Sequence, residues 1–122
     1  IKKTVERVRY VTYDSINIRK EKQFNQELAL AAEFIQNDCF GIEIDLDAIP
    51  NIPSSAMTLS GFSIEELRQF VTFFGKNKNA AYLHICEGAP DLAEGKNNHL
   101  VGKLIGYLVT DFIKSNNHIG EL

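Results

Sequence analysis

The fold is decided by the stretch Phe40-Gly41-Ile42-Glu43-Ile44-Asp45-Leu46-Asp47-Ala48-Ile49, in which acidic and apolar side chains alternate. Successive side chains of an extended strand point to opposite faces, so the three carboxylates share one face of a strand over residues 40–46, and the apolar side chains share the other. Three neighbouring carboxylates repel one another. They are tolerated where water covers that face or where a cation neutralises them.

The composition is that of an ordinary globular domain. The 122 residues are 44% hydrophobic and 24% charged, and the formal net charge is −3. A chain of this length buries about two thirds of its unfolded surface. Without a basic excess, nucleic acid is not expected as a partner. The sequence has no apolar run near the roughly 20 residues that span a bilayer and begins without a signal-peptide pattern, so we expect no membrane association and a cytoplasmic location.

The two cysteines, Cys39 and Cys86, have neither the spacing of a metal site nor that of a disulfide framework. In two parallel neighbouring strands, Cys39 would lie near the start of one and Cys86 at the end of the other, too far apart for a disulfide. We therefore expect two reduced, buried thiols.

Strand-like and helix-like periods alternate along the chain, which predicts an α/β layer structure. Strands are expected at residues 8–13, 40–46 and 80–86, helices at 24–35, 63–75 and 100–113, and a long irregular loop at 49–62. Ser63 and Glu66 have the spacing of a capping box at the start of the second helix.

This order predicts three βα units in a three-layer α-β-α arrangement around a mainly parallel sheet. Ligands of open α/β sheets bind at the carboxyl ends of the strands. Asp45 and Asp47 close one strand and Glu87 closes the next, so these three carboxylates are expected to converge on one edge of the sheet.

Two interpretations of the acidic row are open from the residues alone. One is a solvated face of an edge strand. The other is that Asp45 and Asp47 are hard oxygen ligands for Mg²⁺ or Mn²⁺, which prefer carboxylates and water. Because two carboxylates do not complete such a site, further ligands must come from other strand ends, another chain or a missing part of this one.

Residues 40–115 resemble the ureohydrolases, the family of arginase, agmatinase and formimidoylglutamase. The last metal-binding motif of that family is a strand ending in Asp-x-Asp, followed by a long loop with Pro, Ser, Thr and Gly and then by a helix. Ile44-Asp45-Leu46-Asp47 and the loop up to Ser63 follow this order. The family then has a hydrophobic strand ending in a glutamate, with a proline three residues later, which matches Tyr82–Pro90. The similarity is greater to the formimidoylglutamase-like branch than to arginase itself.

The resemblance implies that residues 1–122 are the C-terminal part of an arginase-like α/β domain. It implies that Asp45 and Asp47 are ligands of a binuclear manganese centre, and that Glu87 receives the cationic guanidinium or formimino group of a small-molecule substrate. The family's other metal motifs, a Gly-Gly-Asp-His run and an Asp-Ala-His-x-Asp run, are not found in the sequence. The isolated chain is therefore expected to be inactive without the missing N-terminal part, and the intact protein to be a homo-oligomer.

Other residues have two possible roles each. Thr58 is a candidate for contact with the substrate from the loop, with backbone capping as the alternative. His84 lies inside an apolar strand and is expected to be a hydrogen-bonded core histidine rather than a ligand. His99 is expected to belong to a helix start or to face solvent, and His118 is given no role.

Two other functional classes compete with the ureohydrolase interpretation. Asp45-Leu46-Asp47 after a hydrophobic strand also resembles the opening motif of haloacid-dehalogenase-type phosphatases, in which the first Asp is a nucleophile and the second an acid/base beside Mg²⁺. The paired acid that this family has after a later strand is absent from the sequence. The third possibility is a non-catalytic domain that keeps an inactive hydrolase fold.

Overall fold

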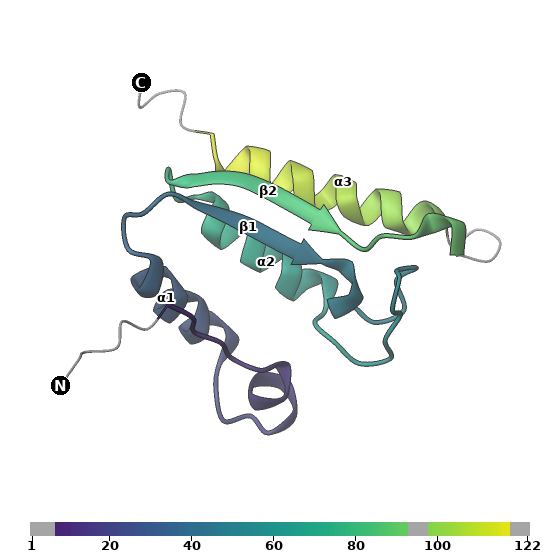
Figure 1. The fold of residues 1–122 in the computed structure, drawn as a ribbon, viewed down its shortest axis with the longest axis horizontal. Helices are drawn as coiled ribbons and strands as arrows, with labels where there is room; N and C mark the ends of the chain where they lie inside the picture. Colours follow the sequence, from purple (N-terminus) through teal and green to yellow (C-terminus); the bar gives the residue numbers. More distant parts are fainter. Residues whose placement is uncertain (1–6, 93–97, 118–122) are drawn as a thin grey trace. The chain divides into compact units, whose positions relative to one another are not determined.

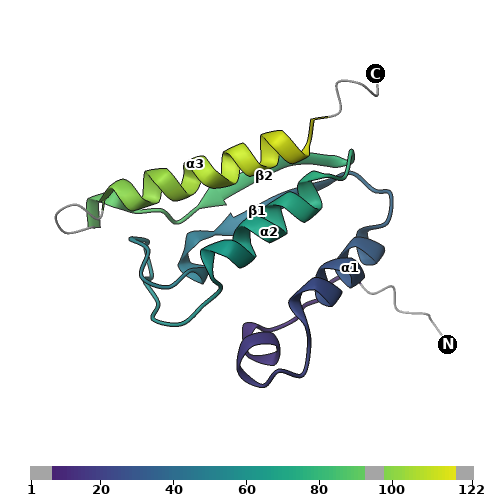
Figure 2. The same cartoon turned by 180° about the vertical axis from the view of Figure 1, so that it is seen from behind.

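The structure is a computed structural model that describes residues 7–92 and 98–117. The chain divides into two compact units, Ile1–Gln36 and Asn37–Leu122. Figure 1 shows the elements of each unit, and Figure 2 shows them from behind. Among the described residues, no helix has both the length and the apolar character needed to cross a bilayer.

The first unit contains a π-helical turn at Asp14–Ile18 and the helix α1 at Phe24–Ile35. The prediction of a strand at residues 8–13 is wrong, because residues 7–12 have no regular secondary structure. β-branched and aromatic residues favour a strand only where a neighbouring strand accepts its hydrogen bonds. In the described part of the chain, no strand pairs with this segment.

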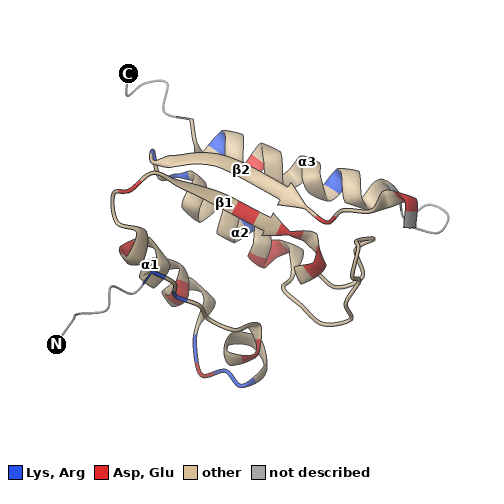
Figure 3. Cartoon of the chain, in the orientation of Figure 1, with Lys and Arg blue, Asp and Glu red and all other residues tan. Residues whose placement is uncertain are grey.

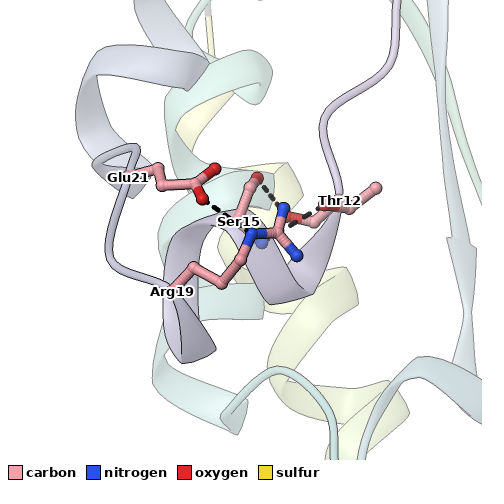
Figure 4. A network of polar contacts seen from close by, with 4 residues as sticks. All are labelled: Thr12, Ser15, Arg19 and Glu21. Atoms are coloured by element: carbon pink, nitrogen blue, oxygen red, sulfur yellow. Dashed lines mark hydrogen bonds and ion pairs between the residues drawn. The ribbon is translucent and has the colours of Figure 1, made fainter.

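Local side-chain contacts fix the turn of the first unit (Figure 4). The Ser15 hydroxyl donates to the Thr12 carbonyl at 2.7 Å, and the Ser15 amide donates to the Thr12 hydroxyl at 3.2 Å. Arg19 Nε donates to Glu21 Oε1 at 2.9 Å. These contacts join residues two or three positions apart, so they stabilise the turn locally, and Ile16 of the same turn is buried.

The second unit is built on a parallel pair of strands, β1 at Phe40–Asp45 and β2 at Ala80–Cys86. In their register, Ile42 lies beside Leu83, Ile44 beside Ile85 and Asp45 beside Cys86. Ile42 and Ile44 are buried, whereas Glu43 and Asp45 are exposed. The alternation seen in the sequence therefore corresponds to one covered and one open face of the sheet.

Two helices cover the apolar face, α2 at Ile64–Gly75 and α3 at Asn98–Ser115, and Figures 1 and 2 show both on the same side of the strands. The predicted capping box of α2 is confirmed, since the Ser63 hydroxyl accepts from the Glu66 amide and the Glu66 carboxylate accepts from the Ser63 amide, both at 3.0 Å. The buried positions of the two helices recur at helical spacing: Leu67, Val71 and Phe74 on α2, and Val101, Leu104 and Leu108 on α3.

The α/β class and the parallel pairing are confirmed. The predicted arrangement has more βα units and more layers than the described residues form. The structure has two βα units, β1–α2 and β2–α3, instead of three. Within the described part of residues 37–122, no helix covers the open face of the sheet, so this unit has two layers. Whether residues 1–122 form part of one arginase-like domain stays a prediction.

The two cysteines are free, as predicted, but they are not both buried. Cys39 is exposed because it precedes β1, and Cys86 is half-buried at the end of β2. Their positions at opposite ends of the strand pair agree with the expected separation.

The predicted irregular loop after β1 is held closed by backbone hydrogen bonds. The Asn51 amide donates to the Thr58 carbonyl at 3.1 Å, and the Phe62 amide donates to the Ala48 carbonyl at 2.9 Å. Gly61 lies at this second closure, where an added Cβ would come within 2.2 Å of the Ala48 oxygen. A side chain at this position would therefore separate the loop from the end of β1.

Replacing Gly61 by Ala is expected to lower the free energy of unfolding by about 1–3 kcal/mol, because the added methyl group meets backbone that is already hydrogen-bonded. Gly106→Ala is the matched control: it lies on the exposed side of α3 with no atom within 4 Å of the new Cβ. It should raise stability by about 0.5–1 kcal/mol. Urea denaturation of both variants measures the difference, and equal midpoints would contradict the close approach.

Candidate functional site

The carboxylates predicted to act together lie at the carboxyl edge of the sheet. β1 ends at Asp45, and β2 ends at Cys86 immediately before Glu87. Because the strands are parallel and Asp45 lies beside Cys86, both strand ends are at the same edge. Figure 3 shows acidic residues along β1, in the turn after it and just after β2.

Asp45 and Asp47 bind backbone amides that shape the turn after β1. Asp45 Oδ1 accepts from the Asp47 amide at 2.9 Å, which caps the 3₁₀ turn Leu46–Ala48. Asp47 Oδ1 accepts from the Ala56 amide at 2.9 Å, and its Oδ2 accepts from the Ser55 hydroxyl at 3.1 Å. The first carboxylate therefore orients the second, and the second fixes the loop.

Hydroxyl and amide groups of this loop stabilise the charged form of Asp47. Its pKa is lowered from the ordinary value of 3.8, first by the Ser54 hydroxyl, then by the Ala56 amide, while desolvation opposes the shift and the Ser55 hydroxyl adds to it. Ser54 is 1% exposed, and its oxygen has no partner of good hydrogen-bond geometry among the described residues. Ser54 therefore acts as a nearby dipole, whereas the Ala56 amide and the Ser55 hydroxyl donate the hydrogen bonds that hold the Asp47 carboxylate.

Glu87 reaches the same loop from the other strand. Its carboxylate oxygen Oε2 contacts the Ser55 hydroxyl, and its carbonyl accepts from the Ser55 amide at 3.0 Å. One hydroxyl thus lies between the carboxylates of Asp47 and Glu87, so the predicted convergence of these two groups is observed. Asp45 joins them through its bond to the Asp47 amide.

The backbone of Glu87 is in the left-handed region, with φ of 69°. This conformation costs a residue with a side chain about 1–2 kcal/mol relative to the right-handed one. Pairing with the loop holds it in place: Ser54 and Gly88 form an antiparallel bridge, and the Ala89 amide donates to the Pro53 carbonyl at 3.0 Å. Non-glycine residues in such conformations cluster at functional sites.

Thr58 is occupied within its own turn. Its hydroxyl donates to the Ser60 carbonyl at 2.9 Å and accepts from the Ser60 amide at 3.3 Å. This is the backbone-capping role that the sequence left as the alternative, and contact with a substrate stays a prediction.

Ser54 and Ser55 were missed as site residues by sequence reasoning, which treated them as part of an irregular loop. Their role depends on contacts with Asp47, 8 positions from Ser55, and with Glu87, 32 positions from it. The only local signal is a pair of hydroxyl residues in the loop that follows Asp-x-Asp.

The open face of the sheet carries a second polar group. His84 Nδ1 lies 2.5 Å from Glu43 Oε2, and the Tyr82 hydroxyl contacts the same carboxylate. The prediction of a core histidine is wrong, because the His84 side chain is 58% exposed. An apolar run predicts coverage on both faces, but the two described helices after β1 cover only one face. His99 lies exposed in the first turn of α3, and His118 lies outside the described residues.

The residues present fit a metal centre only in part. Carboxylate oxygens are the donors that Mn²⁺ and Mg²⁺ prefer, and Asp45 and Asp47 offer such oxygens at the edge of the sheet. Within residues 7–92 and 98–117, however, no group of three or more His, Cys, Asp and Glu side chains could hold a metal ion. This chain can therefore contribute ligands but does not provide a whole centre.

Comparison with solved structures identifies a related fold. The chain is similar to the crystal structure of Entamoeba histolytica arginase in complex with L-ornithine, with a TM-score of 0.61 and 21% sequence identity. The match covers 74% of this chain and 32% of the arginase chain, so this chain spans about a third of that protein's length. No protein-family model and no curated protein sequence matches it. The chain therefore has part of the arginase fold.

The strain at Glu87 can be measured with two substitutions that both remove the carboxylate. Glu87→Gly relieves the left-handed conformation and Glu87→Ala does not, so the glycine variant should be more stable by about 0.5–1 kcal/mol. Urea denaturation of both variants gives the difference. An alanine variant as stable as the glycine variant would show that this backbone is not strained.

The contact between Glu43 and His84 predicts sensitivity to acid. His84 first, and then Tyr82, lower the pKa of Glu43 from its ordinary value of 4.5. Because the folded-state pKa is the lower one, the stabilisation is complete above the unfolded-state value and is lost as the pH falls through the folded-state value. The free energy of unfolding should therefore decline less steeply in Glu43→Gln than in the unchanged chain as the pH falls below the ordinary Glu43 pKa of 4.5. Equal slopes in Glu43→Gln and the unchanged chain would contradict the prediction.

Proposed function

We propose that this chain supplies one side of the active site of a manganese-dependent ureohydrolase, which hydrolyses a C–N bond of a guanidino or formimino substrate. A formimidoylglutamase-like activity is favoured, with arginase-like or agmatinase-like activity next. The observation that carries the proposal is the meeting of Asp47 and Glu87 at one hydroxyl, at the carboxyl edge of a parallel sheet, in a chain with part of the arginase fold.

Asp45 and Asp47 would be the manganese ligands of this chain. Once bound, the metal centre would supply a hydroxide nucleophile at neutral pH. The amide of Asp47 and the amide of Ala56 hold one oxygen of each carboxylate, which limits their rotation before any ligand binds. The remaining ligands would come from a part of the protein outside this chain, so the chain alone should not hydrolyse the substrate.

Glu87 would bind the substrate's cation. A carboxylate matches a planar amidinium-type cation through two parallel N–H···O bonds, which fixes the plane of the reacting carbon. Its exposed position at the strand end leaves it accessible to a ligand, and the left-handed backbone directs the strand end toward the loop. Glu87 would thus bind the substrate and orient it for nucleophilic attack, which lowers the entropic part of the activation barrier.

The test uses the intact protein that contains this chain, loaded with Mn²⁺ and assayed with formiminoglutamate, agmatine and arginine. Asp47→Asn should lose bound manganese and turnover together. Glu87→Gln should keep its manganese while kcat/KM falls about 10- to 100-fold, because a charge-assisted hydrogen bond to the substrate is lost. Metal analysis after gel filtration and product release measure the two effects, with Asp38→Asn as the control.

Three results would contradict the proposal. Undiminished manganese in Asp47→Asn would remove this residue from the metal ligands. Equal turnover by Glu87→Gln and the unchanged protein would remove Glu87 from substrate binding. Phosphatase activity without amidine hydrolysis would favour the haloacid-dehalogenase-type alternative, and neither activity would favour a non-catalytic domain.

A further inference from the structure

We infer that Ser55 is a positioning residue, which holds the Glu87 carboxylate in place for the substrate's cation at a set distance from Asp47. This inference rests on the proposed function. The Ser55 side chain contacts the carboxylates of both residues, and its backbone amide also donates to the Glu87 carbonyl at 3.0 Å. Ser55 therefore binds Glu87 at two points, one on the main chain and one on the side chain.

The loop places Ser55 rigidly enough for this role. On one side, the neighbouring Ser54 pairs with Gly88 in an antiparallel bridge. On the other side, the Ala56 amide donates to Asp47 Oδ1 at 2.9 Å. The residues before and after Ser55 are thus bound to the two segments that it connects, so its hydroxyl has little freedom to leave the gap between them.

The segment after β2 is also fixed by its packing on the buried core. An added Cβ at Gly88 would lie 3.1 Å from side-chain atoms of both Leu46 and Val101, which are buried. The chain therefore passes directly over the core at this point. With its following residue packed on the core and its carbonyl bound by Ser55, Glu87 has its main chain fixed, and its side chain is oriented chiefly by the Ser55 hydroxyl.

The chemistry of a hydroxyl explains why this contact matters for a cationic ligand. A serine hydroxyl has one proton, so it donates to only one of two carboxylates at a time. The other carboxylate then lacks that donor and is best neutralised by a positive charge. Ser55 thus holds two like charges close together, where a cation beside either of them would relieve their mutual repulsion.

The experiment compares Ser55→Ala and Ser55→Thr in the intact, manganese-loaded protein. Without the hydroxyl, we expect the dissociation constant of guanidinium ion, measured by calorimetry, and the KM of the cationic substrate each to rise about tenfold. Ser55→Ala also removes the bond to Asp47 Oδ2, but Asp47 Oδ1 keeps its bond from the Ala56 amide and Asp45 Oδ1 keeps its bond from the Asp47 amide. The effect on manganese content and on kcat should therefore be smaller than the effect on guanidinium binding and KM. Ser55→Thr restores the hydroxyl and should return both binding values to within about threefold of the unchanged protein.

Ser115→Ala is the matched control, because it removes a hydroxyl whose bond to the Phe112 carbonyl lies on α3. It should leave guanidinium binding unchanged. If Ser55→Ala leaves guanidinium affinity and KM unchanged while Glu87→Gln weakens guanidinium binding and raises KM, the role of Ser55 is overturned and the proposed function is not. Loss of manganese from Ser55→Ala, or failure of Ser55→Thr to restore binding in a folded protein, would show a structural role instead. An unchanged protein that neither binds guanidinium nor hydrolyses any of the substrates would overturn both this inference and the proposed function.

Discussion

Parallel pairing of β1 with β2 is the constraint on which the rest of the second unit depends. It brings the carboxyl ends of both strands to one edge, so the acidic residues that end them meet there. The apolar residues between the acidic ones face α2 and α3, and their burial keeps the register, since a shift by one residue would exchange the two faces. Leu46 is fully buried between Asp45 and Asp47, which anchors the acidic end of β1 to the core.

Because the acidic residues at the ends of β1 and β2 meet at one edge, they form a cluster of like charges. The loop after β1 must accommodate this cluster. The loop does so with donors: the Asp47 amide donates to the Asp45 carboxylate, and the Ala56 amide and the Ser55 hydroxyl donate to the Asp47 carboxylate. The pKa of Asp47 is lowered first by the Ser54 hydroxyl, and then by the Ala56 amide and the Ser55 hydroxyl. The described structure therefore stabilises the charged form of Asp47 without a basic side chain. The edge of the sheet therefore keeps its negative charge, which a neighbouring lysine or arginine would have cancelled.

Local patterns predicted the parts of the fold that depend on local physics. Alternation identified β1, the Ser63 and Glu66 capping box identified the start of α2, and the apolar stripe identified α3. Failures occurred where the outcome depends on distant neighbours. The segment 8–13 has strand-forming residues but no described strand to pair with. His84 lies on a face that none of the described helices of its unit covers. Ser55 escaped notice because its significance comes from Glu87, 32 residues away.

The backbone of Glu87 shows how the loop and the core together fix the end of β2. Glycine is the residue that adopts a φ of 69° without steric cost, and a strand end at this position would be more stable with it. The next residue, Gly88, is itself a glycine and lies against Leu46 and Val101. The chain therefore has a glycine where the core leaves no room for a side chain and a glutamate where the backbone is strained. Burial does not offset this strain, because the carboxylate is exposed. The bridge between Ser54 and Gly88 and the bond from the Ser55 amide to the Glu87 carbonyl hold the backbone instead, so the loop sets the direction in which the carboxylate leaves the edge of the sheet.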